Sequence, residues 1–493
     1  MRIFVAAAAC AMAMMADIRL PALIGDHMLV QRDVPARIFG WADPGEQVTV
    51  QFKGQTIAAT TNDKGKWHVW LQPMEASSSG AELRISGKNS ITIQDVLVGE
   101  VWVGSGQSNM GWTVKASNNA AQEISAASYG QLRLFKVTLR TTPDPQEDVE
   151  GKWMVCSPDT IADFTAVGYF FVRELHKKMN VPFAMIQSAW GGTPAQAWTS
   201  RRALYADSSL FPILAEWNRA LEGYPAAMDR YTREIETFEA ARKNGGAGAR
   251  RPTAPMGPGH SHTPAGLFNA MINPLTPYTI RGAIWYQGES NASKIQAPLY
   301  RRLFETMILD WRRAWAQGEF PFLYVQLANF AKAGSPSDWV VVQEAQTKTL
   351  ELRNTGMAVI NDIGEAGDIH PKNKQDVGAR LALAARHIAY KEQLVYSGPR
   401  FRQATAEGAR MRAWFDSVGG GLQARGGGDP KGFEVAGADG QWHPADAKVD
   451  GKTVVASSPS VTVPIHVRYA WASDPVANLV NAEGLPASVF RSE

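Results

Sequence analysis

Six short apolar runs, separated by longer stretches with helical periodicity, constrain the fold of the middle of the chain. The runs are 98–103, 132–137, 183–186, 282–286, 322–327 and 357–360. Runs that are apolar on both faces are typical of strands in a sheet that is covered on both sides. The segments between them carry apolar residues at helical spacing, as in 166–179, 299–315 and 376–390. We therefore predict an α/β domain with a mainly parallel sheet over residues 96–395.

A β pattern flanks this domain on both sides. Residues 17–95 alternate apolar and polar side chains between turn signals, and a similar pattern returns over 396–493 after Gly-rich turns at 418–428. We expect a β-sandwich-type domain at each end. Residues 222–265 interrupt the α/β pattern with an exposed helix and a Gly/Pro-rich loop, which we interpret as a lid beside the active site.

The first 16 residues predict a secretory signal peptide. Arg2 precedes the apolar residues 3–16, a stretch that is shorter than the ~20 residues of a membrane-spanning helix. We expect a mature chain that begins near Asp17 and a periplasmic or secreted location. Signal removal would leave Cys156 as the one cysteine, which excludes an internal disulfide and is typical of a buried apolar residue.

The charge pattern gives no indication of a polyanionic partner. The net charge of +3 is not gathered into a basic run. Nucleic acid and membrane surfaces are therefore not expected partners. The 16 tryptophans could be sugar-stacking platforms or ordinary core residues.

Four polar, Gly-rich segments follow predicted strands. They are GQSNM (106–110), QSAWGGT (187–193), WYQGESN (285–291) and NDIGEAGDIHPKNK (361–374). Open α/β sheets bind ligands beyond the carboxyl ends of their strands, so the four segments should meet. Together they supply a Ser, a Gly pair, amide donors, carboxylates and a His, which indicates hydrolysis by acyl transfer.

Ser108 and His370 are the predicted nucleophile and general base. Ser108 opens the helix after a buried strand, although Ser is also common as a helix N-cap. Asp368, two residues before His370, could orient the imidazole and stabilise its charged form. Glu365 and Asp362 are alternatives for this acid.

An oxyanion needs convergent hydrogen-bond donors. We predict the N–H of Ser108, the N–H of Gly192 and the side-chain amide of Gln287. The Gly pair at 191–192 could instead form a plain turn, and Gln287 could brace a loop.

The substrate and metal assignments rest on neighbouring residues. Trp112, Trp190 and Trp198 lie near the motifs along the chain and could stack on a sugar or belong to the core. We assign Trp112, Trp190, Glu289 and Asn291 to substrate binding. His260 and His262 could chelate a metal, but their Gly/Pro-rich loop lacks nearby carboxylates, so we predict no metal or other cofactor.

The motifs GQSNM, GGTPAQAW, WYQGESN and DIHPKNKQDVGARLA, in this order, resemble the bacterial sialate O-acetylesterases of the SGNH-hydrolase superfamily. The likeness includes LPALIGDHMLVQRDVPARIFGWADPGEQVTV near the start and VRYAWASDPVANLVNAEGLPASVFR near the end, and so covers nearly the whole mature chain. It implies a three-layer SGNH α/β/α catalytic domain with flanking β domains, no metal, and deacetylation of sugar esters.

On this resemblance, Ser108 matches the family's nucleophile, His370 its base and Asp368 its acid. Gly192 matches the glycine of the second of the four motifs. Gln287 stands in the block where many SGNH enzymes have an oxyanion Asn, and Asp-Ile-His differs from the common Asp-x-x-His spacing. The expected function is that of a serine carbohydrate O-acetylesterase, and the preferred substrate assignment is O-acetylated sialic acid. Acetylated plant hemicellulose (xylan or xyloglucan) is the alternative substrate, and a non-catalytic carbohydrate-binding protein is the alternative class. The presence of Ser108, His370 and nearby acids argues against that class.

Overall fold

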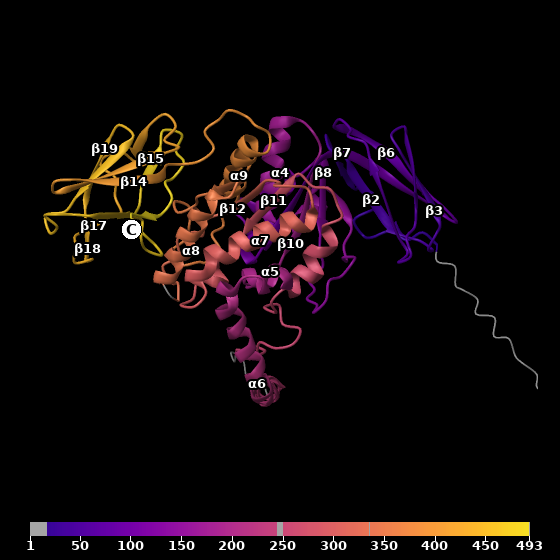
Figure 1. Cartoon of the computed structure of the whole chain (residues 1–493), viewed down its shortest axis with the longest axis horizontal. Coiled ribbons are helices and arrows are strands. Elements are labelled where there is room, and N and C mark those ends of the chain that lie inside the picture. Colours follow the sequence, from indigo (N-terminus) through magenta and orange to yellow (C-terminus); the bar gives the residue numbers. More distant parts are fainter. Residues whose placement is uncertain (1–16, 244–249, 335, 493) are drawn as a thin grey trace, which may run out of the picture.

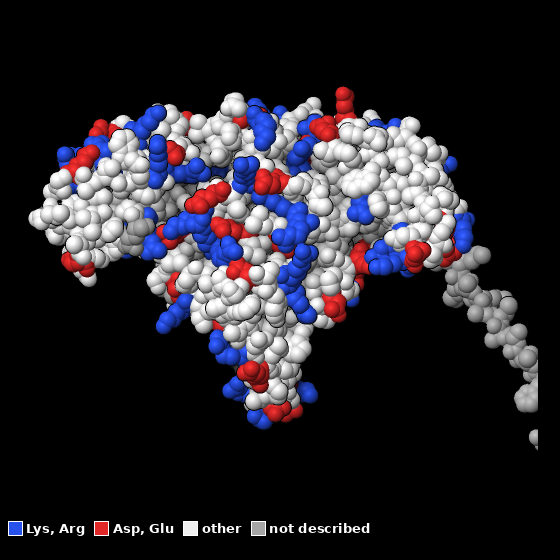
Figure 2. Space-filling model, viewed as in Figure 1, with Lys and Arg blue, Asp and Glu red and all other residues white. Residues whose placement is uncertain are grey.

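A central α/β body lies between two β-rich parts, and one long helix projects from the body (Figure 1). The computed structural model describes residues 17–243, 250–334 and 336–492. The predicted signal segment, residues 1–16, lies outside the described residues. Within the described ranges, no helix combines the length and apolar composition needed to cross a membrane. Figure 2 shows Lys and Arg side chains interspersed with Asp and Glu over the face in view.

All six predicted apolar runs form strands of one central sheet. Its order is β13-β12-β11-β7-β10-β8-β9, and every neighbouring pair is parallel except β8 and β9. The strands are β7 (Ser90–Gly106), β8 (Tyr129–Lys136), β9 (Trp153–Cys156), β10 (Phe183–Ala189), β11 (Gly282–Tyr286), β12 (Phe322–Val325) and β13 (Thr355–Ala358). The antiparallel edge strand β9, which the sequence pattern did not predict, makes the sheet mixed.

Hydrophobic packing on both faces explains why the strands are apolar throughout. On β7, Val101 and Val103 belong to one buried cluster and Trp102 to another. The first cluster includes side chains of α7 (Tyr300–Trp315) and α8 (Pro336–Lys348), and the second includes side chains of α4 (Ala166–Met179) and α9 (Lys374–Ile388). The sheet is therefore covered by helices on both sides. The shorter helices are α1 (Ser108–Gly111), α2 (Ala120–Ser125), α3 (Pro158–Ile161) and α5 (Arg201–Tyr205).

The N-terminal β part is continuous with the central sheet. Its strands are β1 (Leu29–Gln31), β2 (Ala36–Trp41), β3 (Gln47–Phe52), β4 (Gln55–Thr60), β5 (Lys66–Leu71) and β6 (Ser77–Ser86). β2 pairs with β5, and β3 pairs with β4 and β6. β6 pairs with the first half of β7, whose second half enters the central sheet. The expected boundary between residues 95 and 96 therefore falls inside one long strand.

The C-terminal β part contains three small antiparallel sheets, with the orders β14-β15-β20-β19, β16-β22 and β18-β17-β21-β23. Its strands are β14 (Arg400–Glu407), β15 (Arg410–Asp416), β16 (Leu422–Ala424), β17 (Phe433–Ala436), β18 (Trp442–Pro444), β19 (Asp446–Asp450), β20 (Thr453–Ser457), β21 (His466–Tyr469), β22 (Leu479–Asn481) and β23 (Phe490–Arg491). They enclose a hydrophobic cluster of their own.

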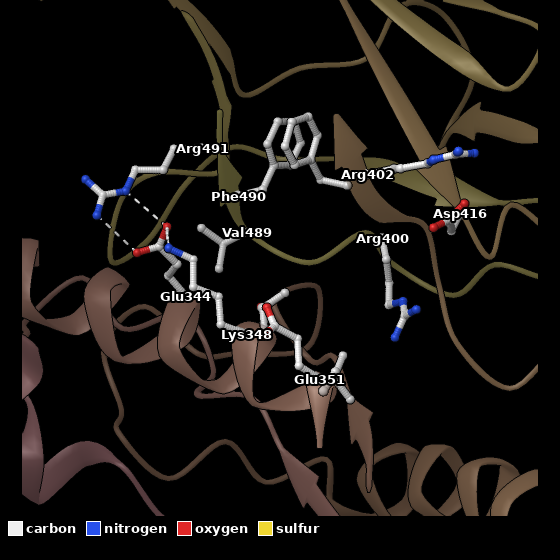
Figure 3. A pocket seen from close by; sticks show the side chains of 12 residues that line it. Glu344, Lys348, Glu351, Arg400, Arg402, Asp416, Val489, Phe490 and Arg491 are labelled. Atoms are coloured by element: carbon white, nitrogen blue, oxygen red, sulfur yellow. Dashed lines mark hydrogen bonds and ion pairs between the residues drawn. The ribbon is translucent and has the colours of Figure 1, made fainter. Parts of the chain in front are cut away.

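Ion pairs join this part to the central body. Arg491 contacts Glu344 of α8 through two hydrogen bonds of 3.0 and 3.2 Å. A cavity of about 470 Å³ lies beside this contact, between the end of α8 and strands β14 and β23 (Figure 3). Lys348 also contacts Glu344 there. Its lining includes Leu350 and Glu351, which precede β13, and none of the predicted catalytic residues.

The insertion is a helical arm. α6 (Phe211–Lys243) begins before the expected boundary at residue 222 and extends away from the body (Figure 1). The return segment, residues 250–265, reaches the body again where the N–H of Ala265 donates to Gln196 O at 2.9 Å. The expected exposed helix is thus the second half of a longer one.

Candidate active site

Strand register brings the first three polar segments to one level at the carboxyl edge of the sheet. Ala189 of β10 and Tyr286 of β11 both pair with Gly106, the last residue of β7. Gly106 has a φ of +138°, and a Cβ atom there would lie 2.2 Å from Tyr286 O. A glycine is therefore required where β7 approaches β11, two residues before Ser108.

The predicted nucleophile and base are in hydrogen-bond contact. His370 Nε2 lies 2.8 Å from Ser108 Oγ. The N-cap position of α1 is Gln107, so Ser108 is the first helical residue and its hydroxyl faces the imidazole. Burial and the nearby charge of Lys374 lower the pKa of His370, while Asp368 acts in the opposite direction. A neutral imidazole that contacts a hydroxyl can accept its proton.

Asp368 lies beside His370, whereas its main rival is engaged elsewhere. Asp368 Oδ1 accepts the backbone N–H of His370 at 2.9 Å and lies 3.8 Å from His370 Nδ1. Asp362 instead receives two hydrogen bonds from Arg380, at 2.6 and 2.7 Å, and lies 2.5 Å from Arg425. The second alternative, Glu365, accepts the N–H of Lys372 at 2.8 Å.

The first residue of the glycine pair, Gly191, lies directly against the nucleophile. A Cβ atom at Gly191 would come within 3.3 Å of Ser108 Cβ, and Gly192 adopts a φ of +73°. The N–H of the preceding Trp190 donates to Gly106 O at 3.1 Å. This bond ties the second polar segment to the first. The small residue at 191 allows the close approach to Ser108, and the positive φ at 192 favours glycine there.

Gln287 has its amide engaged inside the protein. The side chain is fully buried, and its Nε2 donates to Thr193 O at 3.2 Å and to Asn291 Oδ1 at 2.7 Å. Its Oε1 accepts from the Tyr300 hydroxyl at 2.9 Å. Both donors of the Gln287 amide are therefore engaged by groups other than Ser108. The side chain connects the segments that carry Thr193, Asn291 and Tyr300. Asn291 is also fully buried, and its amide donates to Gln196 and Gln296.

A buried polar network behind Ser108 was not predicted from the sequence. Lys374 is fully buried, and its ammonium donates to Asn109 Oδ1 at 2.5 Å. Asn109 Nδ2 donates to Glu289 Oε1 at 2.6 Å and to Ile369 O at 3.0 Å. Burial lowers the pKa of Lys374 to about 7 and raises the pKa of Glu289. Glu289, which we assigned to substrate binding, thus holds the residue next to the nucleophile.

The three tryptophans near the motifs occupy different environments. Trp112 stacks on His370, with ring centroids 4.8 Å apart and an interplanar angle of 16°. Trp190 is partly buried. Trp198 is fully buried against Trp285, and its Nε1 donates to Thr193 Oγ1. The idea that Trp198 could reach a sugar is therefore wrong, because its ring belongs to the core.

The His260 and His262 pair faces the protein backbone. His262 Nε2 lies 2.6 Å from Gly192 O, and the N–H of His262 donates to His260 Nδ1 at 3.1 Å. Among the residues that the structure describes, no group of three or more His, Cys, Asp or Glu side chains is placed to hold a metal ion.

Comparisons with known proteins agree with the chemistry of these residues. Residues 263–387 match the family described as carbohydrate esterase, sialic acid-specific acetylesterase. The sialate O-acetylesterase of Rattus norvegicus is 31% identical over 427 residues, which cover 77% of this chain and 75% of that protein. The human sialate O-acetylesterase is 29% identical, over 93% of this chain and 88% of that protein.

A solved structure matches the whole architecture. The carbohydrate acetylesterase from Xanthomonas citri superposes with a TM-score of 0.83 at 38% identity, covering 97% of this chain and 99% of that chain. The agreement includes the β-rich parts at both ends as well as the central body. The chain therefore belongs to the sialate O-acetylesterase family of carbohydrate esterases.

Proposed function

We propose that this carbohydrate O-acetylesterase acts through a covalent acetyl-enzyme on Ser108. The observation that carries the proposal is the 2.8 Å contact between Ser108 Oγ and His370 Nε2. As Oγ attacks the acetyl carbon, His370 takes the hydroxyl proton. It then gives this proton to the sugar oxygen as the ester C–O bond breaks, which releases the sugar and leaves the acetyl group on Ser108.

Water completes the reaction by the same route. His370 accepts a proton from water, the resulting hydroxide attacks the acetyl carbon, and the proton returns to Ser108 Oγ as acetate departs. Asp368 orients the imidazole and stabilises its charged form. The oxyanion of each tetrahedral intermediate accepts hydrogen bonds from the N–H groups of Ser108 and Gly192. Gln287 supports this arrangement through Thr193, because its own donors are engaged.

We also propose a three-layer SGNH-type catalytic domain, β-sandwich-type flanking domains and a periplasmic or secreted location. The helix-covered central sheet supports a three-layer SGNH-type catalytic domain, and the flanking strands support β-sandwich-type domains. The N-terminal sequence supports a periplasmic or secreted enzyme. We expect an acetylated carbohydrate as the partner, and neither nucleic acid nor a membrane.

Of the two candidate substrates, we propose O-acetylated sialic acid in preference. The rat and human relatives carry the name sialate O-acetylesterase, and the matched family is described as sialic acid-specific. The X. citri protein is described more broadly, as a carbohydrate acetylesterase. Acetylated xylan or xyloglucan is therefore the second candidate substrate.

The test combines one variant with a substrate panel. Ser108→Ala should lose at least ~10⁴-fold in kcat for p-nitrophenyl acetate, because no acetyl-enzyme can form. Circular dichroism should show an unchanged fold. Acetate release by the wild-type enzyme from O-acetylated sialic acid, acetylated xylan and acetylated xyloglucan then identifies the substrate.

Two outcomes of this test would count against the proposal. A Ser108→Ala enzyme that keeps more than about a hundredth of the wild-type rate would show that the nucleophile is misassigned. Faster hydrolysis of a butyrate or octanoate ester than of every acetylated sugar would contradict the carbohydrate assignment.

A further inference from the structure

The return segment of the helical arm places an imidazole against the glycine proposed to bind the oxyanion. His262 Nε2 lies 2.6 Å from Gly192 O. Because a carbonyl oxygen can only accept, the proton of this hydrogen bond belongs to Nε2. Burial lowers the pKa of His262, and the contact with Gly192 opposes this shift. The imidazole can donate to the carbonyl in both protonation states, so the bond persists through the titration of His262.

A compact turn holds this imidazole in place. The N–H of His262 donates to His260 Nδ1 at 3.1 Å, and the two rings pack edge to face with centroids 4.7 Å apart. Thr263 donates to His260 O through its N–H at 3.0 Å and its hydroxyl at 2.7 Å. Two residues later, Ala265 is bonded to Gln196 of the body. His262 is therefore anchored from both sides of the turn.

Gly192 needs such a restraint. It adopts a φ of +73°, and a Cβ atom built there would meet nothing within 4 Å. A glycine in open space can rotate either adjoining peptide at low cost. A rotated peptide would turn a carbonyl oxygen, instead of an N–H, toward the developing negative charge. The N–H of Gly192 belongs to the peptide before this residue and its carbonyl to the peptide after it. A hydrogen bond that fixes the carbonyl holds one side of Gly192 and so limits the rotations about this residue that would turn its N–H away from the oxyanion.

We propose that His262 is a positioning residue that holds Gly192 in the conformation required for oxyanion binding. The inference rests on the proposed function, because it assumes that Gly192 serves the oxyanion formed at Ser108. It makes the arm part of the catalytic apparatus: α6 leaves the body after the second polar segment, and its return segment comes back to hold that segment.

The test compares three substitutions at one position. Glutamine places its amide nitrogen near the position of Nε2, asparagine is too short to reach Gly192 O, and leucine lacks a donor. We expect His262→Leu and His262→Asn to lose ~10–100-fold in kcat with KM within about twofold, which is less than complete removal of an oxyanion donor. His262→Gln should recover to within about threefold of the wild-type kcat. Met256→Ala is the matched control, because Met256 is 45% exposed in the same return segment.

Two substrates separate positioning from sugar contact. An effect on the oxyanion should lower kcat equally for p-nitrophenyl acetate and for an acetylated sugar, because both pass through the same tetrahedral intermediate. A rise in KM confined to the sugar would overturn the inference and make His262 a substrate contact. Unchanged kcat in a folded His262→Leu enzyme would overturn it as well. If Ser108→Ala is inactive in either case, the proposed function stands independently.

Discussion

Exchanging one carboxylate at a time, Asp362→Asn and Asp368→Asn, should separate stability from catalysis in the loop that carries His370. Asp362 is a buried ion-pair partner of Arg380 and Arg425, with a side chain that is 8% exposed. Burial raises the pKa of Asp362, but the two arginines outweigh burial and hold the pKa below its usual range. The carboxylate is therefore ionised and joins the catalytic domain to the C-terminal part.

Asp362→Asn leaves Arg380 without its charged partner. Breaking a buried pair in this way costs ~3–5 kcal/mol. We expect the lower end, about 3 kcal/mol, because water can solvate Arg425, whose side chain is 43% exposed. The assay is urea denaturation, with kcat measured well below the unfolding midpoint. The free energy of unfolding should fall, while kcat should stay within about threefold of wild type.

Asp368→Asn should instead lower kcat and leave the free energy of unfolding almost unchanged. Asp368 Oδ1 lies 3.8 Å from His370 Nδ1, and its side chain is 43% exposed. At about 4 Å, a charge pair is worth ~1 kcal/mol in water and ~4 kcal/mol at an effective dielectric constant of 20. An intermediate value of about 2 kcal/mol corresponds to a ~30-fold loss of kcat. Stability should change by less than about 0.5 kcal/mol, since the side chain is exposed. A larger loss of kcat in a folded Asp362→Asn enzyme would refute this reasoning and make Asp362 the acid.

Two further predictions concern the surroundings of Ser108. Lys374→Met should shift the acid limb of kcat/KM to higher pH, because burial and then the Lys374 charge lower the pKa of His370. Lys374 has a pKa of about 7, so it is charged where His370 titrates. Lys372→Met, at an exposed lysine, is the control, and a limb that stays in place or moves down in Lys374→Met would contradict the prediction. Gln287→Ala should lower the free energy of unfolding by ~1–3 kcal/mol, because it leaves buried partners such as Asn291 and Tyr300 unsatisfied. Unchanged stability with a ~100-fold lower kcat would instead support an oxyanion role for Gln287.

The strands and the meeting of the polar segments were predictable because they depend on local pattern. A run that is apolar on both faces has few alternatives to a buried strand, and the carboxyl ends of parallel strands share one edge. This is why Gly106, Ala189 and Tyr286 lie in register. The edge strand β9 was missed because Trp153–Cys156, although apolar throughout, is only four residues long, and so short a run does not by itself distinguish a strand from another buried segment.

The partners of individual side chains were less predictable because they come from distant segments. In the sequence Asp362 is a reasonable rival to Asp368, but in the fold it pairs with Arg425 of the C-terminal part. Trp198 lies close to the glycine pair along the chain, but its ring turns into the core against Trp285. His262 stood out as half of a chelating pair. Its contact with Gly192 depends on the length of the arm, which no local pattern specifies.

The buried polar network behind Ser108 explains why an asparagine, Asn109, follows the nucleophile. Lys374 lies in the polar stretch Pro371-Lys372-Asn373-Lys374, and such a lysine is expected to be exposed to solvent. Lysine is almost never fully buried unless it has a partner. Here the partner is an amide. Asn109 accepts from Lys374 through Oδ1 and donates to Glu289 through Nδ2. A carboxylate at this position could accept from Lys374 but would repel Glu289, and an amine would do the reverse. An amide satisfies both neighbours without neutralising either, so the positive charge of Lys374 can still lower the pKa of His370.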